Sequence, residues 1–344
     1  MNERRPAAEL GLGPATRLLW RSPASVHLEL GDRAVVVDGL PTDLVRRVAA
    51  PTPPTGPPVP ADDRSAAALA ELSDSGFLWP CSNADEDRLR MPPEPRLAGE
   101  LAALAVRHGT GAAAVLAARR RAIIEIAGRS RVAAQLATVL AASGVGRVHC
   151  AADGVARLHQ VAPAGIAMSD EGDLLSVATE RALRRVAPNI DTAPLALGER
   201  PQLTVLAVDG PAPDERHTAL HAADAPYLAV SLGVDSGVVG PLVLPGLTSC
   251  LRCADLHRRD RDPAWPALAV QLTVQRRYGP TSAATVATIV AGVAAQQVLA
   301  FLDGDEPSAL EGTIELHLPD WRLRRRSWPP HPDCGCVATG ERQP

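Results

Sequence analysis

Residues 17–38 alternate between apolar and polar side chains in three short runs. The runs are RLLWR at 17–21, SVHLEL at 25–30 and RAVVVD at 33–38, and a Ser-Pro turn and Gly31-Asp32 separate them. Period-two alternation between turn residues is typical of β-strands that bury one face. The pattern therefore predicts a three-strand meander.

Two helices are predicted after the meander. The first covers residues 41–50 and begins at a proline, where the missing N–H costs nothing. The second starts at the capping residues Asp62 or Asp63 and ends at Ser75. The segment PTPPTGPPVP (51–60) between them is too rich in proline for a helix or a central strand. Residues 1–80 are therefore expected to form a small sheet-and-helix module, followed by a linker at 81–95.

From residue 96 onward, β-branched runs alternate with helical ones. A strand at 121–127, Gly128, an amphipathic helix at 132–143, a strand at 147–151 and Asp153 follow in that order. This order is typical of the first βαβ unit of a dinucleotide-binding fold. Further strands are predicted at 202–208, 227–232, 237–244 and 313–318, and further helices at 97–107, 109–121, 173–186, 213–223 and 283–302. The alternation predicts an α/β domain over residues 96–344, with a mostly parallel central sheet.

The composition narrows the classes of function. The chain has 344 residues, a formal charge of −4 and 35 basic residues, none of which is lysine. This charge gives no general attraction to nucleic acid or to an anionic membrane, and the missing lysine excludes a P-loop lysine or a Schiff base. The N-terminus lacks the apolar segment of a signal peptide, and polar residues interrupt the apolar run 283–302. A cytoplasmic protein is predicted, with neither nucleic acid nor a membrane as partner.

Four of the six cysteines form two close pairs, Cys250-Leu-Arg-Cys253 and Cys334-Gly-Cys336. Two residues between the first pair let both sulfurs face one tetrahedral metal ion, and the second pair completes a four-thiolate site. Four thiolates leave no open coordination position, so the sequence predicts a structural zinc ion. Unrelated thiols are one alternative. A redox CxxC is another, but such a motif opens a helix after a strand, whereas this pair follows a Pro-Gly turn.

The segment GRSRVA (128–133) stands where a dinucleotide fold carries GxGxxG, and only Gly128 of the three glycines is present. Ser130 replaces the second glycine, and its side chain is expected to obstruct the approach of a phosphate. Arg129 and Arg131 can still attract an anion at the helix N-terminus.

Two carboxylates, Asp153 and Asp209, each follow a predicted strand. Such residues bind ribose, metal or phosphate at the edge of a sheet, but they are also common as plain loop or capping residues. Gly128, Asp153 and Asp209 together are the candidate remnant of a nucleotide site.

Residues 95–340 resemble the ThiF/MoeB-type adenylyltransferases, relatives of ubiquitin-activating enzymes. The resemblance is carried by ASGVGRVHCAADGV (142–155), TVLAVDG (204–210), PLVLPGLTSCLRC (241–253) and SWPPHPDCGC (327–336). It implies a zinc ion held by four cysteines, although the second pair here is CxC in place of the usual CxxC. It also implies that Asp153 and Asp209 match the ribose and magnesium carboxylates of the family.

The catalytic parts of that family match poorly. QVAPA (160–164) stands where the family has an arginine that contacts the ATP phosphates, and the family's ATP-contacting lysine is absent. The resemblance therefore implies a degraded ATP site without catalytic residues, which puts ATP as a cofactor in doubt.

The whole chain also resembles actinobacterial ThiF-like proteins with a "bacteriocin biosynthesis cyclodehydratase" domain. These are leader-peptide-binding components of thiazole/oxazole-modified peptide systems. The resemblance implies that residues 1–80 form a winged-helix-like peptide-recognition module, in which the proline-rich segment replaces the middle helix. A leader peptide is expected to add a strand beside Ala34, Val35, Val36, Val37 and Asp38. A YcaO-type protein is the expected partner, and the family tends to form homodimers.

Three functions therefore compete. The first is a non-catalytic scaffold that presents a peptide, and the second is an active adenylyltransferase that acts on the C-terminus of a peptide or carrier protein. The third is a zinc-stabilised regulator that binds DNA through its N-terminal module. The missing lysine argues against the second, and the low net positive charge argues against the third.

Overall fold

The computed structural model describes residues 9–13, 15–50, 62–81, 94–210, 214–274, 282–320 and 322–337. The chain forms two compact units, Met1–Ala117 and Ala118–Pro344. The proline-rich segment 51–60 and most of the predicted linker 81–95 lie outside the described residues.

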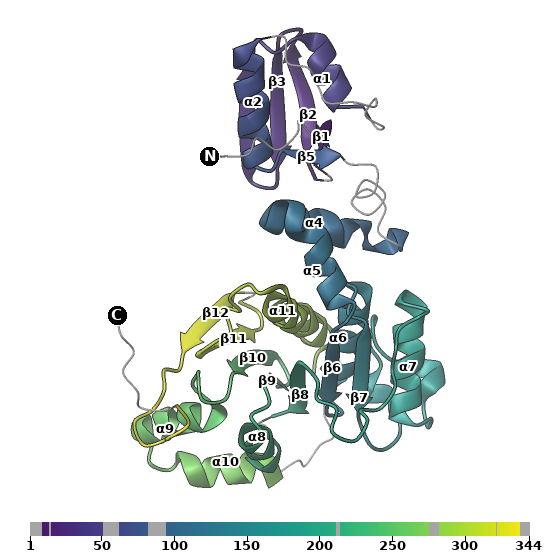
Figure 1. Cartoon of the computed structure of the whole chain (residues 1–344). Coiled ribbons are helices and arrows are strands. Elements are labelled where there is room, and N and C mark those ends of the chain that lie inside the picture. The colour runs from purple at the N-terminus through teal and green to yellow at the C-terminus, as the bar shows by residue number, and fades with distance from the viewer. Residues whose placement is uncertain are drawn as a thin grey trace. The chain divides into compact units, whose positions relative to one another are not determined.

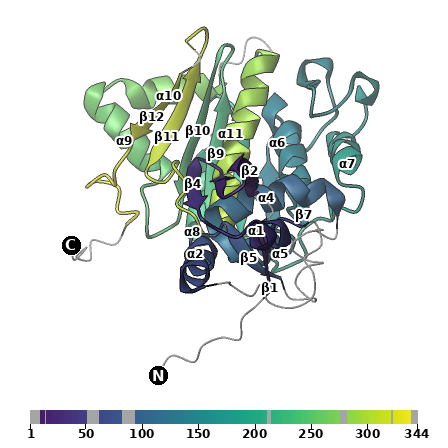
Figure 2. The ribbon, with the colours of Figure 1, turned by 90° about the horizontal axis from the view of Figure 1, so that it is seen from above.

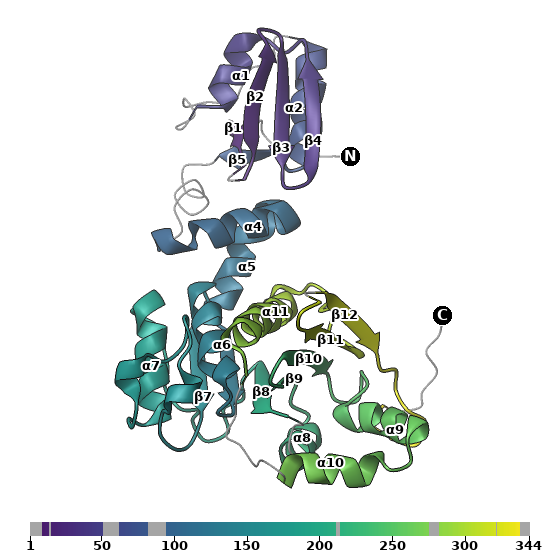
Figure 3. The ribbon, with the colours of Figure 1, turned by 180° about the vertical axis from the view of Figure 1, so that it is seen from behind.

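The first unit contains the predicted meander. Strands β2 (Arg17–Ser22), β3 (Ser25–Leu30) and β4 (Arg33–Asp38) form an antiparallel sheet in the order β2-β3-β4. Alternate residues of β3 are buried, as the period-two pattern predicts. Helices α1 (Thr42–Val48) and α2 (Asp63–Asp74) cover this buried face (Figure 3).

The caps of α2 follow the sequence closely. The carboxylate of Asp62 accepts a hydrogen bond of 2.7 Å from the backbone N–H of Ser65, which satisfies one of the free donors of the first turn. Gly76, at a φ of +82°, follows the end of the helix. The chain then enters β5 (Leu78–Cys81), which pairs antiparallel with β1 (Glu9–Leu12). The sequence analysis did not predict β1, because a four-residue strand carries little periodic signal.

The boundary between the units differs from the predicted linker. Helices α4 (Ala98–His108) and α5 (Ala112–Arg119) follow the short 3₁₀ helices η1 (Pro95–Leu97) and η2 (Gly109–Gly111). Apolar residues of these helices, among them Leu101 and Leu104, share a buried cluster with Trp79 of β5. This packing places α4 in the first unit, and the division falls after Ala117.

The second unit is an α/β domain built on a seven-stranded sheet of order β12-β11-β10-β9-β8-β6-β7. Its strands are β6 (Ile123–Ala127), β7 (Arg147–Ala151), β8 (Leu203–Asp209), β9 (Tyr227–Leu232), β10 (Ser236–Val243), β11 (Gly312–His317) and β12 (Leu323–Ser327). Strands β7, β6, β8 and β9 are parallel, as predicted, whereas β10, β11 and β12 alternate in direction. The arginine-rich strand β12 was not predicted, because four charged residues within six obscure any alternation.

Helices cover both faces of this sheet. They are α6 (Arg131–Ala142), α7 (Leu175–Val186), α8 (Asp214–Ala222), α9 (Leu251–Arg261), α10 (Trp265–Val274) and α11 (Ala284–Asp303), with short 3₁₀ helices η3 (Leu158–Gln160) and η4 (Met168–Asp170). Figure 1 shows α6 and α11 over one face, and α8 and α9 over the other. Viewed from above, α11 runs beside β9 and β10 (Figure 2).

Two helical stretches, Pro95–Arg119 and Ala284–Asp303, are long and apolar enough to cross a membrane by length and composition. In the second stretch, Val286, Val290 and Val298 are fully or almost fully buried against the sheet. α11 is therefore a core helix of this domain, as its interrupting polar residues predict.

Candidate functional site

A cleft of about 390 Å³ lies at the carboxyl ends of β6, β7 and β8. Its lining comes from these strands, from the loops after β6 and β7, and from α8: Ala127, Gly128, Arg129, Ser130, Ala151, Ala152, Asp153, Leu206, Val208, Asp209 and Arg216. β7 and β8 flank β6 on opposite sides, so the strand order reverses here. Ligands of open α/β sheets bind at such a point. The structure thus brings Gly128, Asp153 and Asp209 together in one cleft.

The glycine at position 128 is required by the backbone of the neighbouring strand. Gly128 has a φ of +136°, and a Cβ there would lie 1.9 Å from the carbonyl oxygen of Ala207. Any side chain would therefore collide with β8. This glycine shapes the turn from β6 into α6, whatever the cleft binds.

Ser130 occupies the position where the fingerprint has its second glycine. Its hydroxyl donates a hydrogen bond of 2.8 Å to Asp209 at the end of β8. The serine side chain is therefore held by the protein and joins two loops of the cleft.

Arg131 does not serve the cleft, contrary to the expectation from the sequence. Its guanidinium donates to the carbonyl oxygen of Val161 at 2.6 and 2.9 Å and to that of Ser282 at 2.8 Å. Gln160 is also engaged, because its side chain accepts from the backbone N–H of Arg157 and donates to the carbonyl of Arg129. Both side chains fix the loop after β7.

Arg129 lines the cleft, as expected, and it is one of two arginines that do so. Arg216, on α8, also lines the cleft. Both residues are exposed, and neither guanidinium has a hydrogen-bond or ion-pair partner within the described part of the chain. The sequence analysis missed Arg216 because it lies seven positions beyond Asp209, and sequence spacing alone does not indicate that both residues line one cleft.

The four predicted cysteines form a second site. Cys250 and Cys253 lie at the start of α9, and Cys334 and Cys336 lie in the segment after β12. The sulfur of Cys250 is 3.5 Å from that of Cys334, and the sulfur of Cys253 is 3.2 Å from that of Cys336. All four ligand atoms lie within 4.8 Å of one another. A tetrahedral metal with bonds of about 2.3 Å places its sulfur ligands about 3.8 Å apart, so the cluster fits such an ion.

The four thiols differ in how readily they ionise. Hydrogen bonding with Cys250, opposed by burial, lowers the pKa of Cys253 to about 4, whereas burial raises the pKa of Cys336 to about 12. Four thiolates this close repel one another, so without a cation some must stay protonated. A divalent ion stabilises the fully deprotonated set.

The contrast between this cysteine pair and a redox CxxC at the start of a helix does not hold. Cys250 is the N-cap of α9, so this motif does open a helix. The approach of Cys334 and Cys336 to the same point is what favours the metal.

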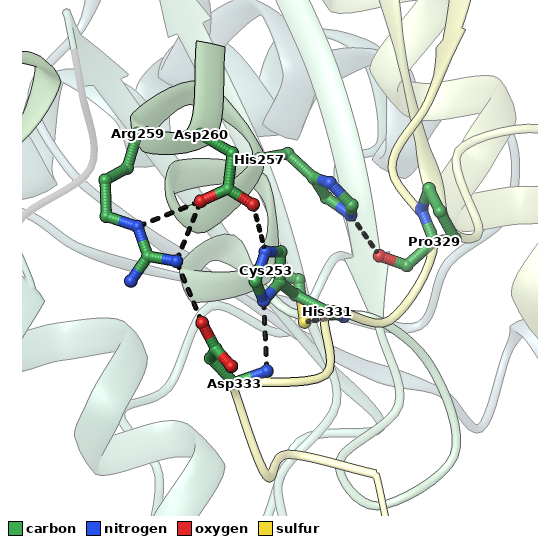
Figure 4. Close-up of polar contacts among 7 residues, drawn as sticks. All are labelled: Cys253, His257, Arg259, Asp260, Pro329, His331 and Asp333. Carbon is green, nitrogen blue, oxygen red and sulfur yellow. Dashed lines mark hydrogen bonds and ion pairs between the residues drawn. The ribbon is translucent and has the colours of Figure 1, made fainter. Parts of the chain in front are cut away.

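A polar network fastens the second cysteine segment to α9 (Figure 4). The ring of His331 contacts the carboxylate of Asp260 through Nε2 at 2.7 Å and accepts from the backbone N–H of Asp333 through Nδ1 at 3.1 Å. Arg259 bridges Asp260 and Asp333, and the backbone N–H of His331 donates to the sulfur of Cys253 at 3.3 Å. The sequence analysis assigned no role to His331. In the structure it orients the cysteine loop.

The predicted peptide-binding strand, β4, is an edge strand in the described part of the chain. Helix α2 runs beside it and is tied to it at both ends. Arg64 of α2 donates to the carbonyl of Asp38 at 3.4 Å, and Arg33 of β4 donates to the carbonyl of Ser75 at 3.0 Å. These two hydrogen bonds hold α2 alongside residues Ala34–Val37 of β4.

Comparison with known proteins defines the class of fold. No protein-family model matches the chain, and no curated protein matches it. Among solved structures, the chain is similar in fold to E. coli MccB, with a TM-score of 0.67 at 18% identity, covering 95% of this chain and 96% of that chain.

Several of these solved structures are of E. coli MccB. MccB with succinimide has a TM-score of 0.70 at 17% identity, covering 96% of this chain and 100% of that chain. MccB with ATP has a TM-score of 0.69 at 17% identity, covering 95% and 99%. PaaA has a TM-score of 0.58 at 16% identity, covering 76% and 91%. At these identities the likeness is one of fold.

Proposed function

We propose that this chain is a leader-peptide-binding component of a system that modifies ribosomal peptides. The observation that carries the proposal is the open edge of β4. The strand keeps an unbroken register with β3 over all six residues, and Val36 is 40% exposed. An extended peptide can pair with such an edge through main-chain hydrogen bonds, while alternate side chains give selectivity.

The opposite edge of the same sheet is less suited to an added strand. The register of β2 with β3 shifts between Trp20 and Ser22, and Arg17 and Arg21 flank the apolar residues of β2. Bulges and charges of this kind normally block edge-to-edge pairing. Arg33 and Asp38 flank the apolar residues of β4 in the same way, so the difference between the two edges is the bulge, which β4 lacks. Helix α2 beside β4 offers a wall for the side chains of a bound peptide.

Two comparisons support a peptide as the ligand. One of the similar structures is E. coli MccB with MccA, and another is the microcin C7 biosynthetic enzyme MccB in complex with N-formylated MccA. We propose by analogy that a precursor peptide is the substrate-side partner of this chain.

The proposal extends to the other parts of the system. A YcaO-type protein would carry out ATP-dependent cyclodehydration to thiazoles or oxazoles in the cytoplasm, with this chain presenting the peptide. A zinc ion held by Cys250, Cys253, Cys334 and Cys336 would stabilise the α/β domain. The scaffold would act as a homodimer.

Hydrogen exchange on the full-length protein tests the peptide site. The neighbouring genes are first searched for a short Cys/Ser/Thr-rich peptide, and the probe is the synthetic leader of the peptide that this search identifies, with a scrambled leader as control. The amides of residues 34–38 should exchange more slowly with the leader, while those of residues 17–21 in β2 should not change. Full protection of residues 34–38 in the free protein, or equal protection by both peptides, contradicts the proposal.

A second function has one observation in its favour. Arg129 and Arg216 place cationic groups in the cleft, which partly offsets the missing lysine. An ATP-dependent adenylyltransferase acting on the C-terminus of a peptide or carrier protein is therefore the alternative. Pyrophosphate exchange into ATP that depends on the added peptide would favour the alternative over the scaffold, and exchange at background favours the scaffold.

A further inference from the structure

We propose that β12 and the adjoining part of α9 form a docking surface for an extended acidic segment of a partner protein. This interface belongs to the α/β domain, goes beyond the proposed capture of a leader peptide and does not depend on it. Its basis is a group of three arginines around one buried tryptophan, next to the last strand of the described sheet.

Strand β12 is at one edge of the seven-stranded sheet in the described part of the chain (Figure 1). It pairs with β11 in an unbroken antiparallel register from Leu323 to Ser327, and all five of its residues are exposed. An edge strand has a row of backbone N–H and C=O groups that its neighbour in the sheet does not use. An extended segment can therefore add to β12 through main-chain hydrogen bonds.

Trp328 directly follows β12 and is 1% exposed, and its indole N–H donates to the hydroxyl of Thr313 at 3.0 Å. Three guanidinium groups lie near the centre of its ring, those of Arg258 at 4.8 Å, Arg261 at 5.2 Å and Arg326 at 5.6 Å. The first two belong to α9 and the third to β12. The indole ring attracts each cation, but the three like charges repel one another.

Neighbouring carboxylates neutralise these arginines only in part. Arg258 donates to Asp255 at 2.9 Å, and Nε of Arg326 lies 3.4 Å from a carboxylate oxygen of Glu315. Arg261 makes no hydrogen bond or ion pair with any residue that the structure describes. Two carboxylates thus face three guanidinium groups, and a further carboxylate would reduce the repulsion between them.

Arg324 extends the positive charge along the strand. It lies two residues from Arg326, hence on the same face of β12, and its side chain is 63% exposed although it forms an ion pair with Asp320. Arg325, between them, faces the other side and donates to two carbonyl oxygens of the loop before β11 at 2.8 and 3.0 Å. One face of the edge strand therefore has exposed arginines at alternate positions.

This spacing identifies the kind of segment that fits. Charged residues at a sheet edge also prevent pairing with other chains, but that role does not require two arginines of a helix at the same place. Side chains at alternate positions of an added strand would lie beside Arg324 and Arg326. Guanidinium groups bind carboxylates in a bidentate manner, and complementary charge gives selectivity. The surface is therefore suited to a segment with an acidic residue at every second position.

Fluorescence anisotropy with the full-length protein at low ionic strength tests the interface. The probe is a labelled TETETET peptide. An ETTETTE peptide has the same composition but no two glutamates at adjacent positions of one strand face, and a TKTKTKT peptide has the opposite charge. The variants are Arg261→Gln, Arg326→Gln and their combination. Arg121→Gln is the matched control, because Arg121 is exposed in the same domain and lies outside the group around Trp328.

Wild-type protein should bind TETETET more tightly than either other peptide, and the peptide should slow amide exchange at residues 323–327. Each single variant should weaken binding about two- to fivefold and the combination about tenfold, because exposed ion pairs are lost. Arg261→Gln removes no described hydrogen bond, and circular dichroism melting verifies that each variant is folded. The proposal is overturned if TETETET does not bind or binds no better than ETTETTE. Binding without protection of residues 323–327, or variants that act no more strongly than Arg121→Gln, would also overturn it.

Discussion

The hydroxyl of Ser130 lies 2.8 Å from a carboxylate oxygen of Asp209. Ser130 is the N-cap of α6, and Asp209 ends β8, so the bond connects two of the loops that form the cleft. Ser130 is only 5% exposed, and water is poorly placed to replace the bond. Ser130 thus stabilises the wall of the cleft by this hydrogen bond, although the sequence alone shows only that a glycine of the fingerprint is missing at this position.

Ser130→Ala should lower the free energy of unfolding of the α/β domain by about 1.5–3 kcal/mol, because Asp209 loses a buried donor to its carboxylate. A double-mutant cycle with Asp209→Ala isolates the pair, measured by urea denaturation followed in the far ultraviolet. A coupling energy near zero would show that the two residues do not stabilise each other.

The cysteine cluster should hold one zinc ion per chain. Elemental analysis of purified protein should find it, and Cys250→Ser or Cys336→Ser should release it and destabilise the domain, because structural metal binding is coupled to folding. Cys150→Ser is the matched control: Cys150 is on β7, outside the cluster, and burial raises its thiol pKa to about 12. Metal-free protein that is stable and indifferent to chelators would contradict this prediction.

The ion pair between Arg119 and Asp303 is almost completely buried, with side chains 2% and 0% exposed. Two contacts of 2.6 Å join the guanidinium to both carboxylate oxygens, at the ends of α5 and α11. Arg119→Ala should cost about 3–5 kcal/mol, since it leaves a buried charge without its partner. The double variant Arg119→Met with Asp303→Leu should recover most of this loss. Exposed Arg121→Ala should change stability by less than about 0.5 kcal/mol.

Helix α2 should respond to acid through its cap. The hydrogen bond from the backbone N–H of Ser65 lowers the pKa of Asp62 below its ordinary value of 3.8. The cap therefore stabilises α2 fully above pH 3.8, and this contribution is lost as the pH falls through the lowered value. Asp62→Asn keeps a capping oxygen that does not titrate. Hydrogen exchange in α2 should accelerate with acid in wild-type protein more than in Asp62→Asn, and equal acceleration would contradict the prediction.

Local patterns were enough to predict most elements of this fold. The alternation at 25–30 specifies β3 and its buried face, and the strand-glycine-helix order at 121–143 specifies β6 and α6. The close spacing within each cysteine pair was enough to expect that the two pairs meet. In each case the residues that specify the element or the cysteine pair are close together in the sequence.

Features that depend on tertiary packing escaped prediction. β1 and β5 pair across more than sixty residues, and neither strand has a pattern that names its partner. Arg131 was expected at the cleft but donates to the distant carbonyls of Val161 and Ser282, whereas Arg216, which was not predicted, lines the cleft from α8. Such outcomes are decided by the packing of loops, which single-sequence periodicity does not report.

The edge of β4 can be tested by proline at two consecutive positions. In an antiparallel pair, successive residues point their N–H groups alternately to the partner strand and to the open edge. Val35 lies opposite Leu28 of β3, and Val36 lies opposite His27, so one of these two valines donates to β3 and the other faces outward.

Val35→Pro and Val36→Pro are therefore compared, and each serves as the experimental control for the other. Proline at the inward position breaks the ladder with β3 and should unfold the module, which circular dichroism and hydrogen exchange detect. Proline at the outward position keeps the ladder but removes a donor and places a ring against an added strand. That variant should stay folded and bind the leader peptide about tenfold more weakly, measured by fluorescence anisotropy. If the variant that stays folded binds the leader with unchanged affinity, the peptide does not pair with β4.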